Sequence, residues 1–269
     1  RKKKGGQRII HCPTAQLKLV QRQIYEILLK PLPLSPFCHG FRAGFSTLSN
    51  ATQHVHQQYV LNVDIKDFFP SITAARVKEL LMDNLELDIS HIDFLTKLIT
   101  LYGQLPQGAP TSPYIANLVC RKLDIYLAEL CQKVGASYTR YADDLTFSGD
   151  PIVPKLVPII IQIVKQEGFQ VARKKIRVYG KANRQIVTGL VVNSGVVTVP
   201  REIRRNLRAA FYNFGKGKKT TWKGKVVNSD FLYGYLSYVR GIHPIFLDNI
   251  TVHTDTKAES TTSNIISNV

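Results

Sequence analysis

The segment from Ser137 to Ser148 constrains the fold of this chain most, because strand-forming residues alternate there around two adjacent acids, Asp143 and Asp144. This pattern predicts a strand, a tight turn and a second strand. Two neighbouring carboxylates repel each other unless a cation offsets their charge. An ordinary acidic turn is the alternative, since Asp is common in turns. The strand-forming flanks favour a buried hairpin with both carboxylates at its tip.

A third carboxylate, Asp64, ends the short apolar run that begins at Tyr59. If this predicted strand pairs beside the hairpin, Asp64, Asp143 and Asp144 converge as catalytic carboxylates. Such a set can hold two divalent ions about 3.5–4 Å apart, an arrangement that serves nucleotidyl transfer. Magnesium suits an all-oxygen site, with Mn²⁺ as the alternative ion. The backbone carbonyl of Ile65 completes the predicted ligand set.

The remaining periodic stretches alternate between helix and strand patterns. The order of strand, helices, hairpin, helix and strand is typical of a split βαβ sheet with helices on one face. Helices are expected over residues 14–30, 46–58, 73–101 with a break at 88–90, 112–132, 152–167 and 201–214. Strands are expected over residues 59–65, 169–178 and 186–199.

The charge of the chain indicates a polyanionic partner. Its 36 lysines and arginines against 19 acids give a formal net charge of +17, and basic surfaces gain affinity for nucleic acid by counterion release. An anionic membrane surface is the alternative. No stretch reaches the roughly 18 apolar residues that a membrane span needs, so we expect no membrane association. Hydrophobic residues make up 44% of the chain, enough for a sizeable core.

Cysteine spacing and the first residues bear on location. The four cysteines show no C-x-x-C spacing, which predicts reduced thiols in a cytoplasmic protein. The basic start has no apolar segment after it, so no signal peptide is predicted. Position 1 is not methionine, from which we expect a trimmed chain.

One predicted helix, over residues 201–214, is apolar on one side and basic on the other. Such a stripe is usually a solvated face, but the lysines that follow it around Trp222 favour nucleic-acid binding. Beyond Asn249 the chain becomes rich in Ser and Thr, which predicts a loose polar tail. The predicted contacts are Arg201, Arg204, Arg205, Arg208 and Trp222.

A loop from Leu105 to Pro113 adds a third motif. Its prolines and glycine predict a rigid loop before a helix that Thr111 or Ser112 caps. Its L-P-Q-G-x-P-x-S-P string lies between the D-x-x-x-F-F string that starts at Asp64 and the Y-A-D-D string that starts at Tyr141. In this order the three resemble the central motifs of reverse transcriptases, and the resemblance covers nearly the whole chain.

This resemblance implies an α+β right-hand polymerase with helical fingers, an RRM-like (split βαβ) palm and a short helical thumb. It implies an RNA-directed DNA polymerase that uses Mg²⁺ and dNTPs. The expected division is part of the fingers at 1–58, the palm with inserted fingers helices at 59–199, the thumb at 200–250 and the polar tail at 251–269.

The resemblance also implies a nucleotide pocket. Phe69 would be a steric gate whose ring crowds a ribose 2′-hydroxyl and so favours dNTPs. Gln107 and Gly108 would line the pocket, and Arg42 resembles the fingers arginine that approaches the triphosphate. Lys174, or its neighbour Lys175, would lie near the leaving pyrophosphate.

Two short strings resemble signatures of bacterial retron reverse transcriptases: N-A-x-x-H at Asn50–His54 and V-T-G at Val187–Gly189. Taken singly, a polar helix would explain the first string and a turn glycine the second, but both lie at the places expected of a retron enzyme, which favours that branch. By the resemblance, Asn50 and His54 would contact a structured RNA, and Val187, Thr188 and Gly189 would lie near the primer grip.

A retron enzyme in the bacterial cytoplasm would copy a structured noncoding RNA into single-stranded DNA. Priming would start from a 2′-hydroxyl of that RNA, and the context would be antiphage defence with an effector protein. Group II intron-like, diversity-generating and abortive-infection reverse transcriptases are the alternatives within polymerases. A nucleic-acid-binding module with an idle polymerase site is the alternative outside them, and the three intact aspartates argue against it.

Overall fold

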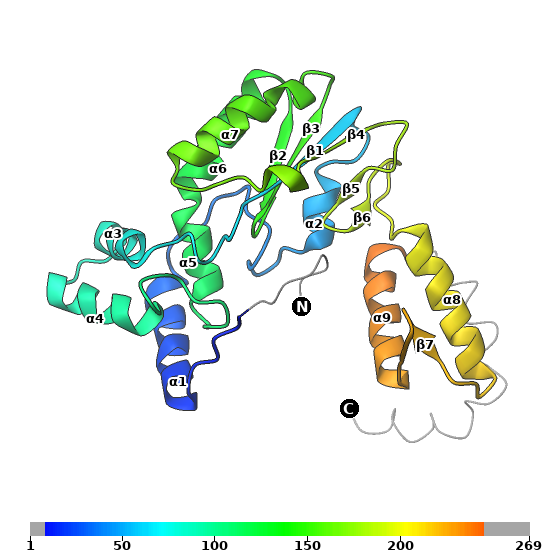
Figure 1. Cartoon of the computed structure of the whole chain (residues 1–269), viewed down its shortest axis with the longest axis horizontal. Helices are drawn as coiled ribbons and strands as arrows, with labels where there is room; N and C mark the ends of the chain where they lie inside the picture. The colour runs from blue at the N-terminus through cyan, green and yellow to red at the C-terminus, as the bar shows by residue number, and fades with distance from the viewer. Residues whose placement is uncertain (1–8, 245–269) are drawn as a thin grey trace.

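A computed structural model describes residues 9–244 of the chain. A four-stranded sheet occupies the centre, with one group of helices on each side of it (Figure 1). The first part of the chain contains α1 (Ala15–Ile24), a π-helical turn η1 (Tyr25–Leu29), α2 (Thr47–Thr52), β1 (Tyr59–Asp64), α3 (Ala74–Asn84), α4 (Ile89–Ile99), α5 (Ser112–Val119) and α6 (Arg121–Lys133).

The hairpin strands β2 (Ser137–Tyr141) and β3 (Asp144–Gly149) follow. After them come η2 (Val153–Leu156), α7 (Val157–Gln166), η3 (Arg173–Lys175), β4 (Arg177–Gly180), β5 (Ile186–Val187), β6 (Leu190–Val191), α8 (Arg201–Gly215), β7 (Thr221–Trp222), β8 (Lys225–Val226) and α9 (Ser229–Ile242).

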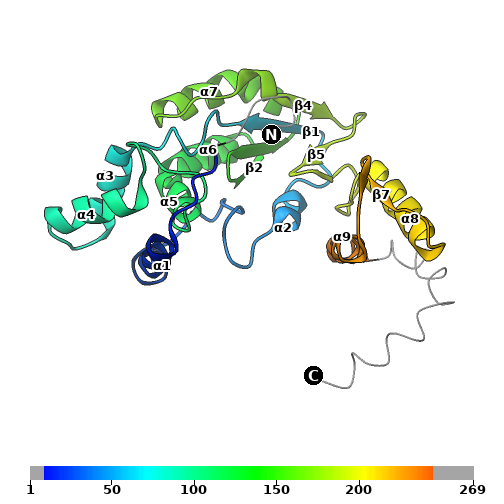
Figure 2. The same cartoon turned by 60° about the horizontal axis from the view of Figure 1, so that its bottom comes forward.

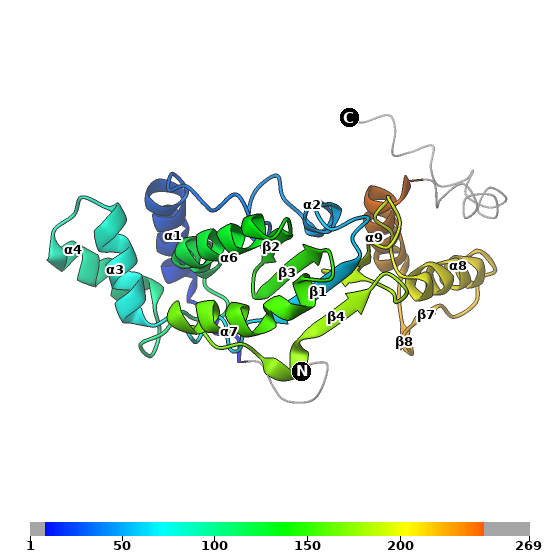
Figure 3. The same cartoon turned by 90° about the horizontal axis from the view of Figure 1, so that it is seen from above.

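The central sheet has the order β2-β3-β1-β4 with every neighbouring pair antiparallel. Helices α6 and α7 cover the same face of the sheet when it is seen from above (Figure 3). Leu61 of β1 and Leu145 and Phe147 of β3 are fully buried beneath them. The predicted α+β class and the split βαβ arrangement of the palm are therefore confirmed.

The helices α1, α3 and α4 form a group on one side of the sheet (Figure 1). Gln21 of α1 donates through Nε2 to the carbonyl of Leu98 in α4 over 2.9 Å, which joins the two helices. The predicted helix over residues 112–132 bends at Cys120, whose ψ of 2° leaves the helical region. Thr111 is the N-cap of α5, but its side chain makes no capping bond, so that prediction was wrong.

A second hydrophobic cluster lies on the other side of the sheet and includes α8 and α9 (Figure 2). Helix α9 was not predicted, although Leu232, Val239 and Ile242 supply a buried apolar side. Asn228 starts it by accepting the backbone N–H of Phe231 over 3.1 Å. Ala51 and Val60 join the same cluster, so the C-terminal helices share apolar packing with the fingers and the palm.

Three predicted elements are shorter than expected. The helix predicted at 46–58 is α2 alone. The strand predicted at 169–178 is reduced to β4, because the chain first follows the end of β1 and then turns through η3. In the stretch 186–199 a two-residue turn at Thr188 and Gly189 reverses the chain and leaves the hairpin β5–β6. The predicted tail at 251–269 lies outside the described residues.

No helix in the part of the chain that the structure describes is long and apolar enough to span a bilayer. The basic start of the chain, residues 1–8, also lies outside the described residues.

Candidate active site

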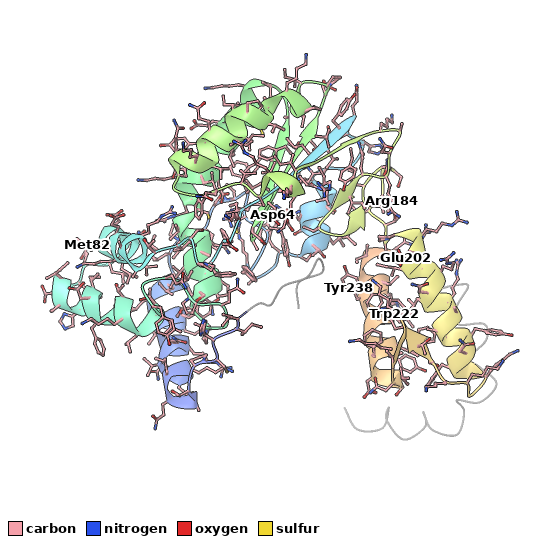
Figure 4. All side chains as sticks on the ribbon, in the orientation of Figure 1. Asp64, Met82, Arg184, Glu202, Trp222 and Tyr238 are labelled. Atoms are coloured by element: carbon pink, nitrogen blue, oxygen red, sulfur yellow. The ribbon has the colours of Figure 1, made fainter. Side chains whose placement is uncertain are left out.

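The sheet brings the three predicted aspartates to one point. Asp64 at the end of β1 lies directly opposite Asp144 at the start of β3. The backbone N–H of Ile65 donates to the carbonyl of Asp143 over 2.9 Å, so the turn residue is tied to the same place. In Figure 4, Asp64 lies between the two groups of helices. Residues almost 80 positions apart in the chain thus share one site because β1 pairs with β3.

The turn that carries Asp143 is as short as an antiparallel hairpin allows. Strand β2 ends at Tyr141 and β3 begins at Asp144, which leaves Ala142 and Asp143 as the two connecting residues. Ala142 is buried and has a φ of 56°, in the left-handed region that non-glycine residues seldom adopt. Backbone strain of this kind persists only where the surrounding structure holds it.

The site concentrates negative charge. Burial of the carboxyl, followed by the nearby charges of Asp143 and Asp64, raises the pKa of Asp144 to about 6. Asp144 is an exposed residue at the start of β3, and the like charges of Asp143 and Asp64 disfavour its ionised form. The ammonium of Lys175 acts in the opposite direction and lowers the pKa. A bound cation would relieve the remaining repulsion.

Among the described residues, Lys175 forms an ion pair with this site. Its Nζ donates to Oδ1 and Oδ2 of Asp64 over 2.6 and 2.8 Å. Within residues 9–244, no three His, Cys, Asp or Glu side chains are arranged as a ready metal site. The donor set nevertheless fits magnesium, since it consists of adjacent hard carboxylates with excess negative charge. An ion on Asp64 would require Lys175 to move from both of its oxygens.

The predicted gate residue, Phe69, lies five residues beyond Asp64 and is partly buried. Its ring centroid is 5.4 Å from that of Phe68 and 6.2 Å from that of Phe41. These two contacts restrict the directions in which the ring can turn. A ring restrained in this way has the rigidity that a steric gate needs, and its role at the sugar stays a prediction.

The loop at Gln107 and Gly108 packs on the first described residues of the chain. The carbonyl of Gln107 accepts the N–H of His11 over 2.8 Å. A Cβ on Gly108 would lie 2.6 Å from the carbonyl oxygen of His11, and its φ is 120°, so glycine is required here. Gly108 therefore has a clear packing role, whereas its contact with dNTP stays a prediction.

The other two residues predicted near the triphosphate, Arg42 and Lys174, differ in their surroundings. Nη1 of Arg42 donates to the carbonyls of Ser35 and Cys38, and the guanidinium lies 4.1 Å from the ring centroid of Phe45. Lys174 is exposed, and its neighbour Lys175 is the residue that reaches Asp64. Of the two lysines that the sequence offered, Lys175 is the one that contacts a carboxylate of the site, and a contact of either lysine with the pyrophosphate stays a prediction.

Four of the predicted nucleic-acid contacts have buried side chains in the structure. Asn50, His54 and Val187 are fully buried, and Trp222 is 9% exposed. His54 lies between the hydroxyls of Thr139 and Ser148, 2.7 Å from each, and burial lowers its pKa to about 3. Trp222 packs on the rings of Phe231 and Tyr235, 5.8 and 4.6 Å away. These side chains are not available to an RNA in this structure.

The remaining predicted contacts lie at or near the surface. Thr188 and Gly189 form the β5–β6 turn with φ values of 47° and 85°, and two positive φ values are typical of a type I′ hairpin turn. Oγ1 of Thr188 donates to the carbonyl of Thr47 in α2 over 3.2 Å. The two retron-like strings are therefore parts of one packed unit. In α8, Arg201, Arg205 and Arg208 are exposed and Arg204 is half-buried.

Sequence reasoning missed a charged group under the turn. Arg140, two residues before Ala142, is fully buried and forms an ion pair with the fully buried Asp124 of α6 over 2.8 Å. A signal for it exists, because arginine is an unusual residue within a strand that is otherwise expected to be buried. Its partner could not be identified from spacing alone, since Asp124 belongs to a different element.

Comparisons with known proteins agree with this geometry. The family described as reverse transcriptase (RNA-dependent DNA polymerase) matches residues 1–203. The retron Mx162 reverse transcriptase of Myxococcus xanthus is 41% identical over 251 residues, which cover 81% of this chain and 52% of that protein. The retron Mx65 reverse transcriptase of the same organism is 37% identical and covers 90% of this chain and 60% of that protein.

A third relative is covered more completely. The retron Ec86 reverse transcriptase of Escherichia coli is 35% identical over 245 residues, which are 89% of this chain and 74% of that protein. The chain spans less of the first two relatives, 52% and 60% of their lengths.

Proposed function

Since the chain belongs to the reverse transcriptase family, with retron enzymes as its matched relatives, we propose that it is an RNA-directed DNA polymerase of the retron type. The observation that carries the proposal is the convergence of three carboxylates. Asp64 faces Asp144 across the β1–β3 pair, and Asp143 is tied to Ile65 next to them. The raised pKa of Asp144 supports a site that is built to receive a cation.

Asp64, Asp143 and Asp144, with the carbonyl of Ile65, would hold two magnesium ions. When bound, the ions supply charge neutralisation for the attacking and leaving oxygens of nucleotidyl transfer. Lys175 would leave Asp64 as the ions enter and would then lie near the pyrophosphate. Phe69 would exclude the 2′-hydroxyl, and the loop at Gln107 and Gly108 would line the nucleotide pocket, with Arg42 towards the triphosphate.

The partners that this function requires are an RNA template, dNTPs and the DNA product. The exposed arginines of α8 and the turn at Thr188 and Gly189 are the candidate surfaces for the nucleic acid. The proposed division into fingers (1–58), palm with inserted fingers helices (59–199) and thumb (200–250) is supported by the arrangement of helix groups on the two sides of the sheet.

Primer extension on an RNA template tests the proposal. The Asp143→Ala/Asp144→Ala variant should lose nearly all extension, because metal catalysis underlies most of the rate. The matched control is Asp150→Ala, an exposed acid just beyond the far end of β3. Equal extension by the double variant and the wild type would overturn the catalytic assignment and favour a binding module with an idle site.

The retron branch makes a separate prediction about bound nucleic acid. A retron enzyme should copurify with one short structured RNA joined to DNA through a 2′-hydroxyl, and sequencing before and after debranching measures this. A heterogeneous or unbranched pool would favour the group II intron-like, diversity-generating or abortive-infection branches. Antiphage defence with an effector protein is a further part of the proposal, which phage plating on cells with and without the complete operon would test.

A further inference from the structure

A buried ion pair lies directly behind the turn that carries Asp143. Nε and Nη2 of Arg140 donate to Oδ1 and Oδ2 of Asp124, each over 2.8 Å. Both side chains are fully buried. The hydroxyl of Tyr138 donates to the same Asp124 Oδ1 over 2.8 Å. The carboxylate is thus saturated by charge-assisted hydrogen bonds, and the guanidinium plane is fixed by a bidentate contact.

The remaining nitrogen of the guanidinium reaches the turn. Nη1 of Arg140 donates to the carbonyl of Ala142 over 3.3 Å and to Oδ1 of Asn117 over 3.0 Å. Ala142 is the residue with left-handed backbone conformation immediately before Asp143. One rigid side chain therefore connects α6, α5 and the turn.

The opposite side of the turn is confined by backbone. The N–H of His39 donates to the carbonyl of Arg140 and the N–H of Arg140 donates to the carbonyl of Phe37, both over 2.8 Å. This brings Gly40 against the turn, where a Cβ would lie 2.6 Å from the amide nitrogen of Ala142. Nδ2 of Asn117 donates a hydrogen bond to the carbonyl of Gly40 over 2.8 Å.

A role in stability alone is a weak explanation for this arrangement. Replacing a buried ion pair with apolar residues of similar volume is often neutral or stabilising, so such pairs are poor devices for stability. Positioning is a better explanation, because carboxylates that bind metal must be held within about 0.5 Å of their productive geometry.

We infer that Arg140, oriented by Asp124, and Gly40 are positioning residues that fix the Ala142–Asp143 turn and thereby the carboxylates of Asp143 and Asp144. This inference rests on the proposed function. Neither residue touches substrate, and both act through the backbone of the turn.

The test compares two glycine substitutions in the palm and fingers. Gly40→Ala would insert a methyl group against the backbone of the turn, without leaving a buried charge unpaired. Gly180→Ala in β4 is the matched control, because its added methyl would meet only the ring of Tyr59 at 3.5 Å, an ordinary contact. Neither glycine has a φ in the left-handed region.

Single-nucleotide incorporation, Mn²⁺ binding by titration calorimetry without nucleotide, and urea unfolding are measured on each variant. Gly40→Ala should lower kcat about 10- to 100-fold, since a displacement near 1 Å is enough for that loss. Its Mn²⁺ affinity should fall, while its KM for dNTP stays at the value of Gly180→Ala, and urea unfolding shows whether the variant is folded. Unchanged kcat and Mn²⁺ affinity in folded Gly40→Ala would overturn the inference.

Arg140→Lys is a second variant that tests the inference if Gly40→Ala fails to fold. Lysine keeps a positive charge beside Asp124 but lacks the fork that also reaches Ala142 and Asn117. The same fall in kcat and Mn²⁺ affinity, with unchanged RNA affinity, is expected, and wild-type values would overturn the inference. Extension by the wild type and by Gly180→Ala reports on the proposed function separately, so the two failures are distinguishable.

Discussion

At the scale of single residues, Phe69 is the side chain that we propose selects the sugar of the incoming nucleotide. Its ring is restrained by Phe68 and Phe41, five residues beyond a carboxylate of the site. A smaller side chain at this position would open space where a ribose 2′-hydroxyl would otherwise meet the ring. Phe69 is therefore the residue on which sugar selection is proposed to depend.

Replacing Phe69 with Val should increase incorporation of rNTPs relative to dNTPs, by about 10-fold or more if contact with the hydroxyl costs at least 1.4 kcal/mol. The ratio of kcat/KM values for dNTP and rNTP measures this. Phe94→Val, at an exposed phenylalanine of α4, is the control and should leave the ratio unchanged. An unchanged ratio in Phe69→Val would show that Phe69 is not the steric gate.

The three aspartates could be found in the sequence because their signals are local. A carboxylate at the end of an apolar run, and two more between alternating strand formers, follow from side-chain periodicity alone. Lys175 and Arg140 could not be assigned in this way. Their contacts with Asp64 and Asp124 join residues that are 111 and 16 positions apart, and no period relates them.

At the scale of elements, His54 connects α2 to the central sheet. The residue follows α2, and its two ring nitrogens lie 2.7 Å from the hydroxyls of Thr139 in β2 and Ser148 in β3. Burial, and then the nearby His39, lowers the pKa of His54 from 6.5 to about 3. The folded protein therefore keeps this imidazole neutral at pH values where the unfolded chain binds a proton.

This linkage has a definite sign. Because the folded pKa lies below the unfolded value, His54 contributes stability that is fully present above pH 6.5 and is lost as the pH falls towards 3. The loss should reach on the order of 5 kcal/mol. In urea unfolding, His54→Gln should be less stable than wild type at pH 7, and the difference should shrink on acidification.

His91→Gln, at an exposed histidine of α4, is the matched control, because it makes the same substitution at the surface. A difference between wild type and His54→Gln that stays constant from pH 7 to pH 4 would contradict the linkage.

The same connection explains why the burial of the string at Asn50–His54 could not be foreseen from the sequence. A polar residue in a sequence is expected at the surface unless a partner satisfies it. The partners of His54 are hydroxyls 85 and 94 positions away, which only the folded sheet brings to it. The burial of Trp222 could not be foreseen for a related reason, since aromatic rings serve equally well in a core and in stacking on bases.

For the whole molecule, the excess of positive charge predicts the behaviour towards RNA. With a net charge of +17, binding should weaken steeply as salt rises, because each neutralised phosphate releases counterions. Only basic side chains that contact phosphates contribute to this salt dependence. Helix α8 is the part proposed to face the nucleic acid.

Replacing Arg201, Arg204, Arg205 and Arg208 with Gln should reduce the salt slope of RNA binding by roughly 0.7–0.9 for each phosphate that these arginines neutralise. The control removes the same number of charges from α6, α7 and η2 with Lys122→Gln, Lys133→Gln, Lys155→Gln and Lys165→Gln. Filter binding across a range of salt concentrations measures both slopes. Equal slopes in the two variants would show that the arginines of α8 do not contact phosphates and form an ordinary solvated face.

The sequence by itself determined the class of the fold, the hairpin and the three carboxylates, because periodicity and strand ends are local properties of the chain. Only the tertiary structure decided which polar and aromatic side chains are buried. It also decided that Lys175 rather than Lys174 meets Asp64, and that Arg140 and Gly40 confine the turn. The physical reason is that burial and charge pairing depend on neighbours distant in the chain, which the pairing of β1 with β3 and the packing of α6 bring together.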